Sequence, residues 1–169
     1  MKKKKKQTQG IFIPYWFRFT LKSIELIFPY FAMRLAAYIF SRPIKFNIPK
    51  KEQISLRSCN STRVFVPDIN KYIMTYEWKN TGKKILISHG WSGRGTQLHK
   101  IAAILNKEGY HVVSFDAPAH GQSTGKKTNM LQWISSMKTL SNKFSEFDYL
   151  IGHSLGGMAA FKYVNEANN

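Results

Sequence analysis

A serine flanked by glycines is the group in this chain best suited to do chemistry. Residues 152–156 read Gly-His-Ser-Leu-Gly; they follow the apolar run 147–151 and precede the helix-favouring residues 158–161. A serine at such a tight strand-to-helix turn is presented above the end of a sheet, where its hydroxyl can attack an electrophile. The turn is tight, so the positions of both glycines require small residues. The alternative is a glycine-rich turn with an incidental serine, because a short motif is only a hypothesis.

Two upstream segments show the same succession of an apolar run and a polar turn. Residues 84–88 (Lys-Ile-Leu-Ile-Ser) predict a buried strand that leads into His89-Gly90-Trp91. Residues 111–115 (His-Val-Val-Ser-Phe) predict a second strand, which leads into Asp-Ala-Pro-Ala-His-Gly-Gln-Ser at 116–123. In order, spacing and strand context, the three motifs resemble the α/β-hydrolase family. Residues 89–97 and the run DAPAHG are similar to one bacterial branch of its serine hydrolases, and the resemblance covers roughly residues 30–169.

This resemblance implies a fold and a set of roles. The expected fold class is α/β, with a mostly parallel sheet of the α/β-hydrolase type that is truncated after the nucleophile turn and its helix, and with an apolar helical segment at the N-terminus. Ser154 would be the nucleophile, and the backbone N–H groups of Trp91 and Leu155 would stabilise the oxyanion. The supporting residues would be His89, Gly90, Gly152, His153 and Gly156. The expected substrate is a small molecule with a carboxylic-ester-type acyl group, attacked to form an acyl-enzyme.

The sequence shows no base for this serine. In the family an acid and then a histidine follow the nucleophile, but residues 155–169 contain Glu166 and no histidine. Glu166 falls about three turns along the predicted helix, which leads away from the serine. Asp116 and His120 are substitutes, although the resemblance assigns them to the turn after the fourth strand. We therefore expect the chain to be the front part of a longer product, and to be inactive alone.

The neighbouring histidines have expected structural roles. His153 adjoins Ser154, but consecutive residues at a strained turn point in different directions, so we expect its ring to pack beneath the turn. His89 is expected to fasten the loop that would carry the oxyanion donor. For Arg94 two roles stay open, namely holding this loop by hydrogen bonds and steering an anionic substrate.

Composition narrows the function classes. The 169 residues are 43% hydrophobic and 14% aromatic, which indicates a folded domain with a real core. A single cysteine, Cys59, excludes an internal disulfide, and the dispersed histidines predict no metal. The net charge is +17, but no aromatic-rich or Cys/His nucleic-acid motif accompanies it, so no nucleic-acid partner is expected. Residues 121–126 and 93–95 fall short of nucleotide-binding fingerprints, which predicts no cofactor.

The N-terminal region differs from the rest of the chain. We expect a basic tail at 1–10, an apolar and amphipathic helical segment at 11–45, and the incomplete hydrolase domain at 46–169. In the segment 11–40, Arg18, Lys22 and Glu25 form one narrow polar stripe, and Pro29 should kink or restart the helix. Charged residues interrupt every run that is long enough for a membrane span or a signal peptide. We therefore expect a cytoplasmic protein, with this segment either at a membrane interface or folded onto the core.

The remaining elements fit a covered sheet. Strands are predicted around 64–66 and 72–78, as antiparallel edge strands, with 44–51 as a linker. Helices are predicted at 96–108, with Leu98, Ile101, Ala102 and Leu105 on one face, and at 130–144, with Ile134, Met137 and Leu140 inward. Two further functions stay open beside the serine hydrolase. They are a non-catalytic hydrolase fold that binds a ligand or a membrane surface, and an acyltransferase that uses the same residues.

Overall fold

The computed structural model describes residues 14–167, and the chain divides into two compact units, Met1–Phe40 and Ser41–Asn169. The predicted basic tail 1–10 and residues 11–13 lie outside the described residues. The first unit contains α1 (Tyr15–Ile27) and α2 (Pro29–Phe40). The predicted restart at Pro29 is confirmed, because proline lacks the N–H that an uninterrupted helix would need but is well tolerated as the first residue of a helix.

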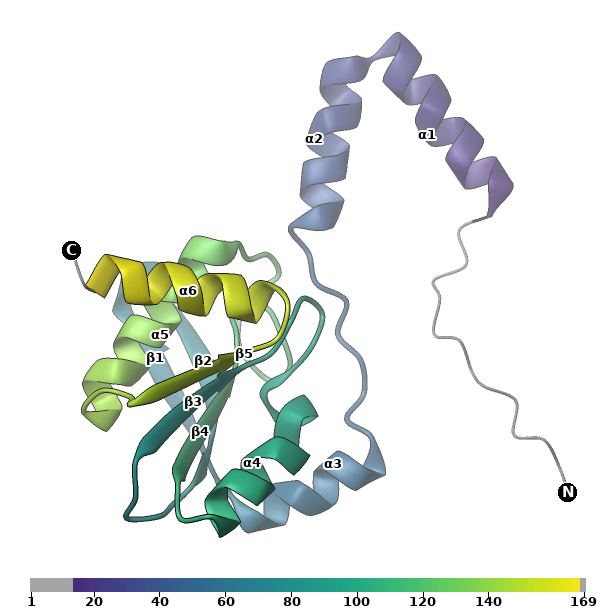
Figure 1. Cartoon of the computed structure of the whole chain (residues 1–169). Helices are drawn as coiled ribbons and strands as arrows, with labels where there is room; N and C mark the ends of the chain where they lie inside the picture. Colours follow the sequence, from purple (N-terminus) through teal and green to yellow (C-terminus); the bar gives the residue numbers. More distant parts are fainter. Residues whose placement is uncertain (1–13, 168–169) are drawn as a thin grey trace, which may run out of the picture. The chain divides into compact units, whose positions relative to one another are not determined.

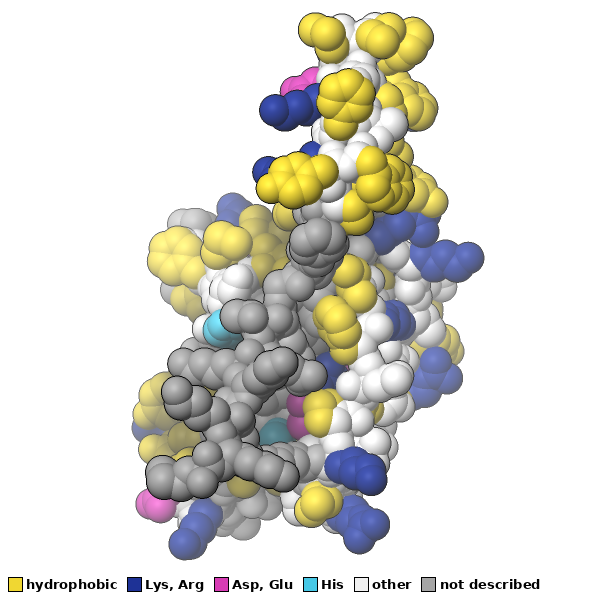
Figure 2. Space-filling view, turned by 90° about the vertical axis from the view of Figure 1, so that its right-hand side faces the viewer, with side chains coloured by type: hydrophobic (Ala, Val, Ile, Leu, Met, Phe, Trp, Pro, Cys, Tyr) yellow, Lys and Arg dark blue, Asp and Glu magenta, His cyan; other side chains and the backbone are white. Residues whose placement is uncertain are grey.

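Neither α1 nor α2 contains a buried residue. In the space-filling view, hydrophobic side chains cover much of this helical part, and the few charged ones lie to one side (Figure 2). Across residues 14–167, no helix combines the length and the apolar character needed to cross a membrane.

The second unit is built on one five-stranded sheet (Figure 1). Its strands are β1 (Asn60–Val66), β2 (Lys71–Trp78), β3 (Lys84–Ser88), β4 (His111–Asp116) and β5 (Tyr149–Gly152), in the order β1-β2-β4-β3-β5. Strand β3, between β4 and β5, runs parallel to both, whereas β2 pairs antiparallel with both β1 and β4. Only β1 of the two predicted antiparallel strands is therefore an edge strand, and β2 lies inside the sheet, where alternate side chains such as Ile73 are fully buried.

Helices cover both faces of the sheet (Figure 1). One face packs against α5 (Met130–Phe144) and α6 (Leu155–Ala167), through a core that includes Leu86, Phe115 and Trp133. The other face packs against α4 (His99–Lys107), through Ile85, Ile87 and Ala102. The remaining short helices are α3 (Lys50–Ser55) and the 3-10 turns η1 (Leu56–Ser58), η2 (Pro67–Ile69) and η3 (Gly95–Leu98). The mostly parallel sheet and its two helical layers confirm the predicted fold class.

Helix α5 has the predicted bounds, and its inward residues Ile134, Met137 and Leu140 are buried as expected. Asn129 begins it by accepting a hydrogen bond from the Gln132 N–H through its side chain. The prediction for 96–108 is wrong at its start, because the tight turn η3 precedes α4 and holds Gly95 and Thr96 in the core. Ile101 is also 42% exposed rather than inward, so the buried face of α4 is narrower than its apolar pattern indicates.

The predicted linker 44–51 is also attached to the second unit. The Ile44 N–H donates to the Ser92 hydroxyl over 3.1 Å, and the Lys45 ammonium donates to the Ser123 carbonyl over 3.0 Å. Periodicity gives no sign of these bonds, because each joins residues that are tens of positions apart in the sequence.

Candidate active site

The three polar turns singled out in the sequence meet at one edge of the sheet. In the parallel registers, Ser88 at the end of β3 lies beside Phe115 of β4 and Gly152 of β5. The segments that follow these strands therefore leave the sheet at the same level. Topology thus brings residues 89–91, 116–123 and 153–154 together, although up to 65 positions separate them in the sequence.

Ser154 occupies the turn between β5 and α6. Its φ is +53°, a left-handed conformation that non-glycine residues rarely adopt and that is often found at functional sites. Its carbonyl oxygen accepts from the Met158 N–H over 3.1 Å and so begins the hydrogen bonding of α6. The side chain is exposed, and its hydroxyl forms no hydrogen bond with any described residue. The turn therefore presents an uncommitted hydroxyl to the surface.

Close backbone approaches explain the two glycines of the motif. A β-carbon at Gly156 would clash with the His89 carbonyl oxygen and would lie 2.6 Å from the Ser88 hydroxyl. A β-carbon at Gly152 would clash with Gly157 in the first turn of α6. Both positions therefore need glycine so that α6 can start directly above the ends of β3 and β5.

Gly90 lies on the other side of the serine. A β-carbon added there would be 3.2 Å from the β-carbon of Ser154 and 2.8 Å from Nδ1 of His153. The loop after β3 therefore borders the serine directly, and Trp91 is the next residue along this loop. The Trp91 ring packs edge-on against the His120 ring, with 5.3 Å between centroids.

His89 and His120 fasten these loops to one another. Nε2 of His89 accepts from the Ala117 N–H over 3.0 Å, so Nδ1 carries the proton and donates to the Gly90 carbonyl over 2.7 Å. Nε2 of His120 likewise accepts from the Ser92 N–H over 3.0 Å, and Nδ1 donates to the Pro118 carbonyl over 3.1 Å. Burial lowers the pKa of His89 to about 3 and that of His120 to about 4. Both rings are neutral at pH 7, with both nitrogens engaged, so neither is available to Ser154.

Asp116 is a second fastening point at this edge. Its carboxylate accepts from the Gly95 N–H over 2.6 Å, the Gln122 N–H over 2.7 Å and the Tyr76 hydroxyl over 2.9 Å. Burial raises the pKa of this carboxyl, while the three donors oppose the shift. The side chain is fully buried and holds two loops, so the structure gives Asp116 a positioning role.

Arg94 is engaged by Glu52 of α3. Its guanidinium donates to the two carboxylate oxygens over 2.6 and 2.7 Å, and the Thr96 hydroxyl donates to the same carboxylate over 2.8 Å. Of the two roles left open for Arg94, this geometry favours holding the loop. Burial raises the pKa of Glu52, but the hydrogen bonds from Arg94 and Thr96 outweigh it, so the net pKa is lowered.

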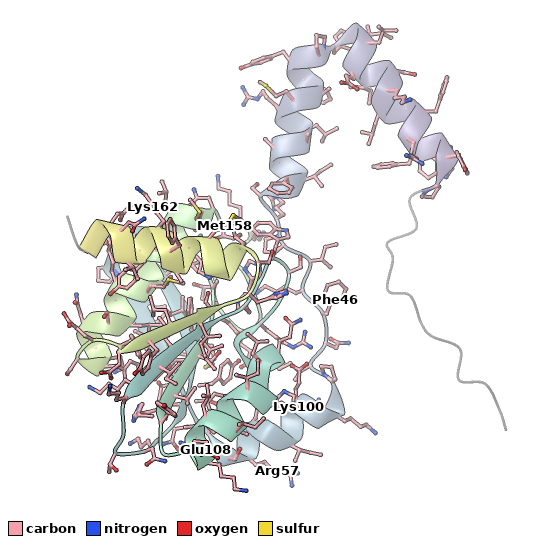
Figure 3. All side chains as sticks on the ribbon, viewed as in Figure 1. Phe46, Arg57, Lys100, Glu108, Met158 and Lys162 are labelled. Atoms are coloured by element: carbon pink, nitrogen blue, oxygen red, sulfur yellow. The ribbon has the colours of Figure 1, made fainter. Side chains whose placement is uncertain are left out.

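Three residues that follow or adjoin the predicted nucleophile in the sequence have different surroundings. The Leu155 N–H is the first of α6 and donates to no other described residue. His153 is exposed, so the prediction that it packs beneath the turn is wrong; β5 is an edge strand and leaves this side of the turn uncovered. Glu166 lies along α6, where it pairs with Lys138 over 2.9 Å and Lys162 over 3.5 Å. In Figure 3, Lys162 and Met158 project from α6 away from the sheet.

Sequence reasoning missed Glu52, Tyr76 and Ser123. Besides the contacts of Glu52 and Tyr76, the Ser123 hydroxyl donates to the Asp116 carbonyl over 2.5 Å and accepts from the Met74 N–H over 2.8 Å. The alternation of side chains along the predicted strand 72–78 indicates that Tyr76 is buried, but it does not indicate which residue the Tyr76 hydroxyl contacts. The carboxylate of Glu52 gives no signal, because it lies between the predicted linker 44–51 and the first predicted strand, around 64–66, where the sequence predicts no element.

A mostly parallel sheet with helices on both faces, and a serine between its last strand and the next helix, define an α/β-hydrolase fold. The model of the family described as serine aminopeptidase, S33 matches residues 79–169, and the chain belongs to this family. A phospholipase of Bacillus subtilis (strain 168), YtpA, is 31% identical to the chain over 91 residues. This match covers 50% of the chain and 35% of the phospholipase, so the chain spans about a third of that relative's length.

Solved structures with the same fold include two esterases and an epoxide hydrolase. The Pyrococcus furiosus esterase Pf2001 superposes with a TM-score of 0.60 and 24% identity, covering 75% of this chain and 51% of the esterase. The Exiguobacterium antarcticum esterase gives 0.57 and 22%, covering 63% and 40%. The epoxide hydrolase VrEH1 of Vigna radiata gives 0.57 and 16%, covering 64% and 36%. At these identities the likeness concerns the fold.

Proposed function

We propose that this chain is the nucleophile-bearing part of a serine hydrolase that acts on carboxylic esters through an acyl-enzyme on Ser154. The observation that carries the proposal is the exposed, left-handed serine at the first turn of α6, with Gly90 against its side chain. Membership of a serine hydrolase family supports it. The phospholipase name of the Bacillus relative supports an ester with an apolar acyl group.

In the proposed reaction, the Ser154 oxygen attacks the acyl carbon, and the carbonyl oxygen becomes an oxyanion. The Leu155 N–H lies at the positive end of the α6 dipole, where such a donor stabilises developing negative charge. The Trp91 N–H is the proposed second donor, because the loop that carries it borders Ser154. Collapse of the intermediate releases the alcohol and leaves the acyl group on the serine, and attack by water then releases the acid.

The hydroxyl proton needs an acceptor, which we propose comes from polypeptide outside residues 14–167. His89 and His120 have both nitrogens engaged, and His111 lies at the opposite, amino-terminal end of β4. Within the described part of the chain, no hydrogen bond joins Ser154 to a histidine. Loss of the base from a complete triad costs on the order of 10⁶ in kcat, so the chain alone should acylate very slowly.

A fluorophosphonate probe tests the proposed nucleophile. We expect slow labelling at Ser154 that imidazole accelerates, because imidazole supplies the absent base from solution. Ser154→Ala should abolish the labelling. Ser145→Ala is a matched control, because Ser145 is also exposed and left-handed, with a φ of +59°, but lies at the C-terminal end of α5. Mass spectrometry of the labelled peptide measures the site.

Two results would reject this function. One is labelling of equal extent in Ser154→Ala, and the other is no labelling of the unsubstituted chain even with imidazole. The acyl product formed from a short-chain p-nitrophenyl ester, with and without an added alcohol, separates hydrolysis from acyl transfer, because p-nitrophenol is released in both reactions. A hydrolase should form the free acid in both cases.

A further inference from the structure

Helices α1 and α2 expose an unusually large apolar surface. Trp16 is 70% exposed, Phe19 75% and Leu26 86%. Other large apolar side chains of this region that are more than half exposed are Tyr15, Ile27, Phe28, Tyr30, Phe31, Met33, Tyr38, Ile39 and Phe40. Both helices belong to one compact unit, yet their mutual contact buries no residue fully. An exposed apolar surface of this extent marks an interaction site.

Charged groups on α1 are confined to one stripe. Arg18, Lys22 and Glu25 follow one another at spacings of four and three residues, which places them on a single face of the helix. The hydroxyls of Thr20 and Ser23 donate to backbone carbonyls one turn earlier, so these residues add little polar surface. An apolar body with a narrow charged stripe fits a boundary between water and lipid.

The net positive charge of residues 1–40 indicates which kind of lipid the helices would bind. Residues 1–40 contain eight Lys and Arg residues and one acidic residue, Glu25. Five of the cations are consecutive, at positions 2–6. Basic residues next to an apolar interfacial segment are attracted to anionic headgroups. A second copy of the chain would bring like charges together, so charge complementarity favours an anionic bilayer over self-association.

The aromatic content and the helix lengths agree with an interfacial position. Residues 11–40 hold ten of the chain's 24 aromatic residues, including Trp16 and Tyr30, and Trp and Tyr concentrate at membrane interfaces. The two helices have 13 and 12 residues. At 1.5 Å per residue each is about 20 Å long, shorter than the ~30 Å hydrocarbon core. We infer that α1 and α2 form an interfacial hairpin that binds the surface of an anionic lipid bilayer without crossing it.

Co-sedimentation of the full chain with vesicles tests this hairpin. We expect the chain to bind vesicles that contain phosphatidylglycerol in low salt, and to bind pure phosphatidylcholine much more weakly. Arg18→Gln with Lys22→Gln should weaken binding about 30-fold, since each basic residue near an anionic surface contributes about fivefold. Trp fluorescence should shift to the blue on binding, and Trp16→Phe should remove the shift, because Trp16 is the single Trp of residues 1–40 and the other three, Trp78, Trp91 and Trp133, belong to the second unit.

A matched pair of variants separates the hairpin from general stickiness. Phe19→Ser with Leu26→Ser removes two side chains that lie about two turns apart on one face of α1, and binding should fall at least tenfold. Ile104→Ser with Leu131→Ser removes two side chains that are each 63% exposed on the other unit, and binding should not change. Circular dichroism verifies that both double variants fold.

Three outcomes would overturn the proposal. The first is no binding to anionic vesicles in low salt. The second is equal loss of binding in both double variants, or equal binding to both lipids. The third is self-association that sedimentation equilibrium detects, that Phe19→Ser with Leu26→Ser abolishes and that anionic vesicles do not compete away. None of these outcomes depends on the reactivity of Ser154.

Discussion

Residues at the strand ends shape the candidate site in two ways, through backbone conformation and through side-chain hydrogen bonds. Ser154 accepts a rare backbone conformation that presents its hydroxyl, and the neighbouring loops are held by rings and carboxylates rather than by backbone alone. His89, His120 and Asp116 are all at most 1% exposed, and each satisfies backbone N–H groups that would otherwise be buried without a partner. Asp116 and His120, the substitutes that the sequence offered for the missing base, are thus committed to structure, and so is His89, as predicted.

These buried histidines predict loss of stability in mild acid. Their folded pKa values of about 3 and about 4 lie below the unfolded value of about 6.5, so below pH 6.5 the unfolded chain takes up protons first. Stability should fall between pH 7 and pH 5 by about 1–2 kcal/mol per histidine. His120→Gln, which keeps an acceptor for the Ser92 N–H, should reduce this slope by about half. Urea unfolding at both pH values measures it, and an unchanged slope in the variant would contradict this account.

At the scale of elements, the first turn of α6 packs directly on the ends of β3 and β5. This contact has no space for side chains, because the backbone of Gly156 contacts Ser88 and His89, and that of Gly152 contacts Gly157. This close packing lets α6 begin at the strand ends and aims its first N–H groups at the same edge as Ser154. The position of α6 therefore depends on glycine, which has no β-carbon, at both 152 and 156.

Gly156→Ala should disrupt the packing of α6 on the strand ends. The added methyl meets backbone atoms, which cannot move aside as a flexible side chain can, so we expect a destabilisation of about 2–3 kcal/mol and loss of Ser154 labelling. Gly157→Ala is the matched control, because its β-carbon would lie 3.2 Å from the nearest atom, the Gly152 carbonyl oxygen. Thermal unfolding of the two variants compares them. Equal stability would show that the first turn of α6 can shift without cost.

At the scale of the whole molecule, the segment before the sheet is part of the hydrolase unit. Glu52 of α3 is 8% exposed and pairs with Arg94 in the loop after β3. Together with the hydrogen bonds of Ile44 and Lys45, this pair holds the polypeptide between α2 and β1 against the loops that border the candidate site. The expected division of the chain at residue 45 stays a prediction, while the two compact units meet at Phe40 and Ser41.

Removing one partner of this ion pair should cost more than removing both charges. Arg94→Gln leaves the Glu52 carboxylate without its main partner and should destabilise the fold by about 2–3 kcal/mol. Glu52→Gln with Arg94→Gln should recover about half of this loss. Because the pair lowers the pKa of Glu52, its contribution is present above the usual glutamate pKa of about 4.3 and is lost as the pH falls through the lowered value. Urea unfolding at pH 7 and pH 3 checks both effects.

Much of the fold was predictable, because it depends on local patterns. The bounds of β3 and α5 follow from apolar runs and periodicity, and the restart at Pro29 follows from a missing N–H. The errors lie where distant contacts override such patterns. Residues 95–98 form a tight turn because Gly95 and Thr96 are recruited by Asp116 and Glu52, and His153 is exposed because its strand lies at an edge.

The sequence by itself determined the hydrolase family, the strand-turn-serine-helix context and the need for glycine at 152 and 156, because motif spacing and the steric limits of a tight turn are local properties of the chain. Only the tertiary structure decided which polar residues meet. It assigned His89, His120 and Asp116 to buried loop contacts and joined Glu52 to Arg94, pairings that depend on strand order and register. It also showed that the contact between α1 and α2 buries no residue of either helix fully, which no local pattern determines.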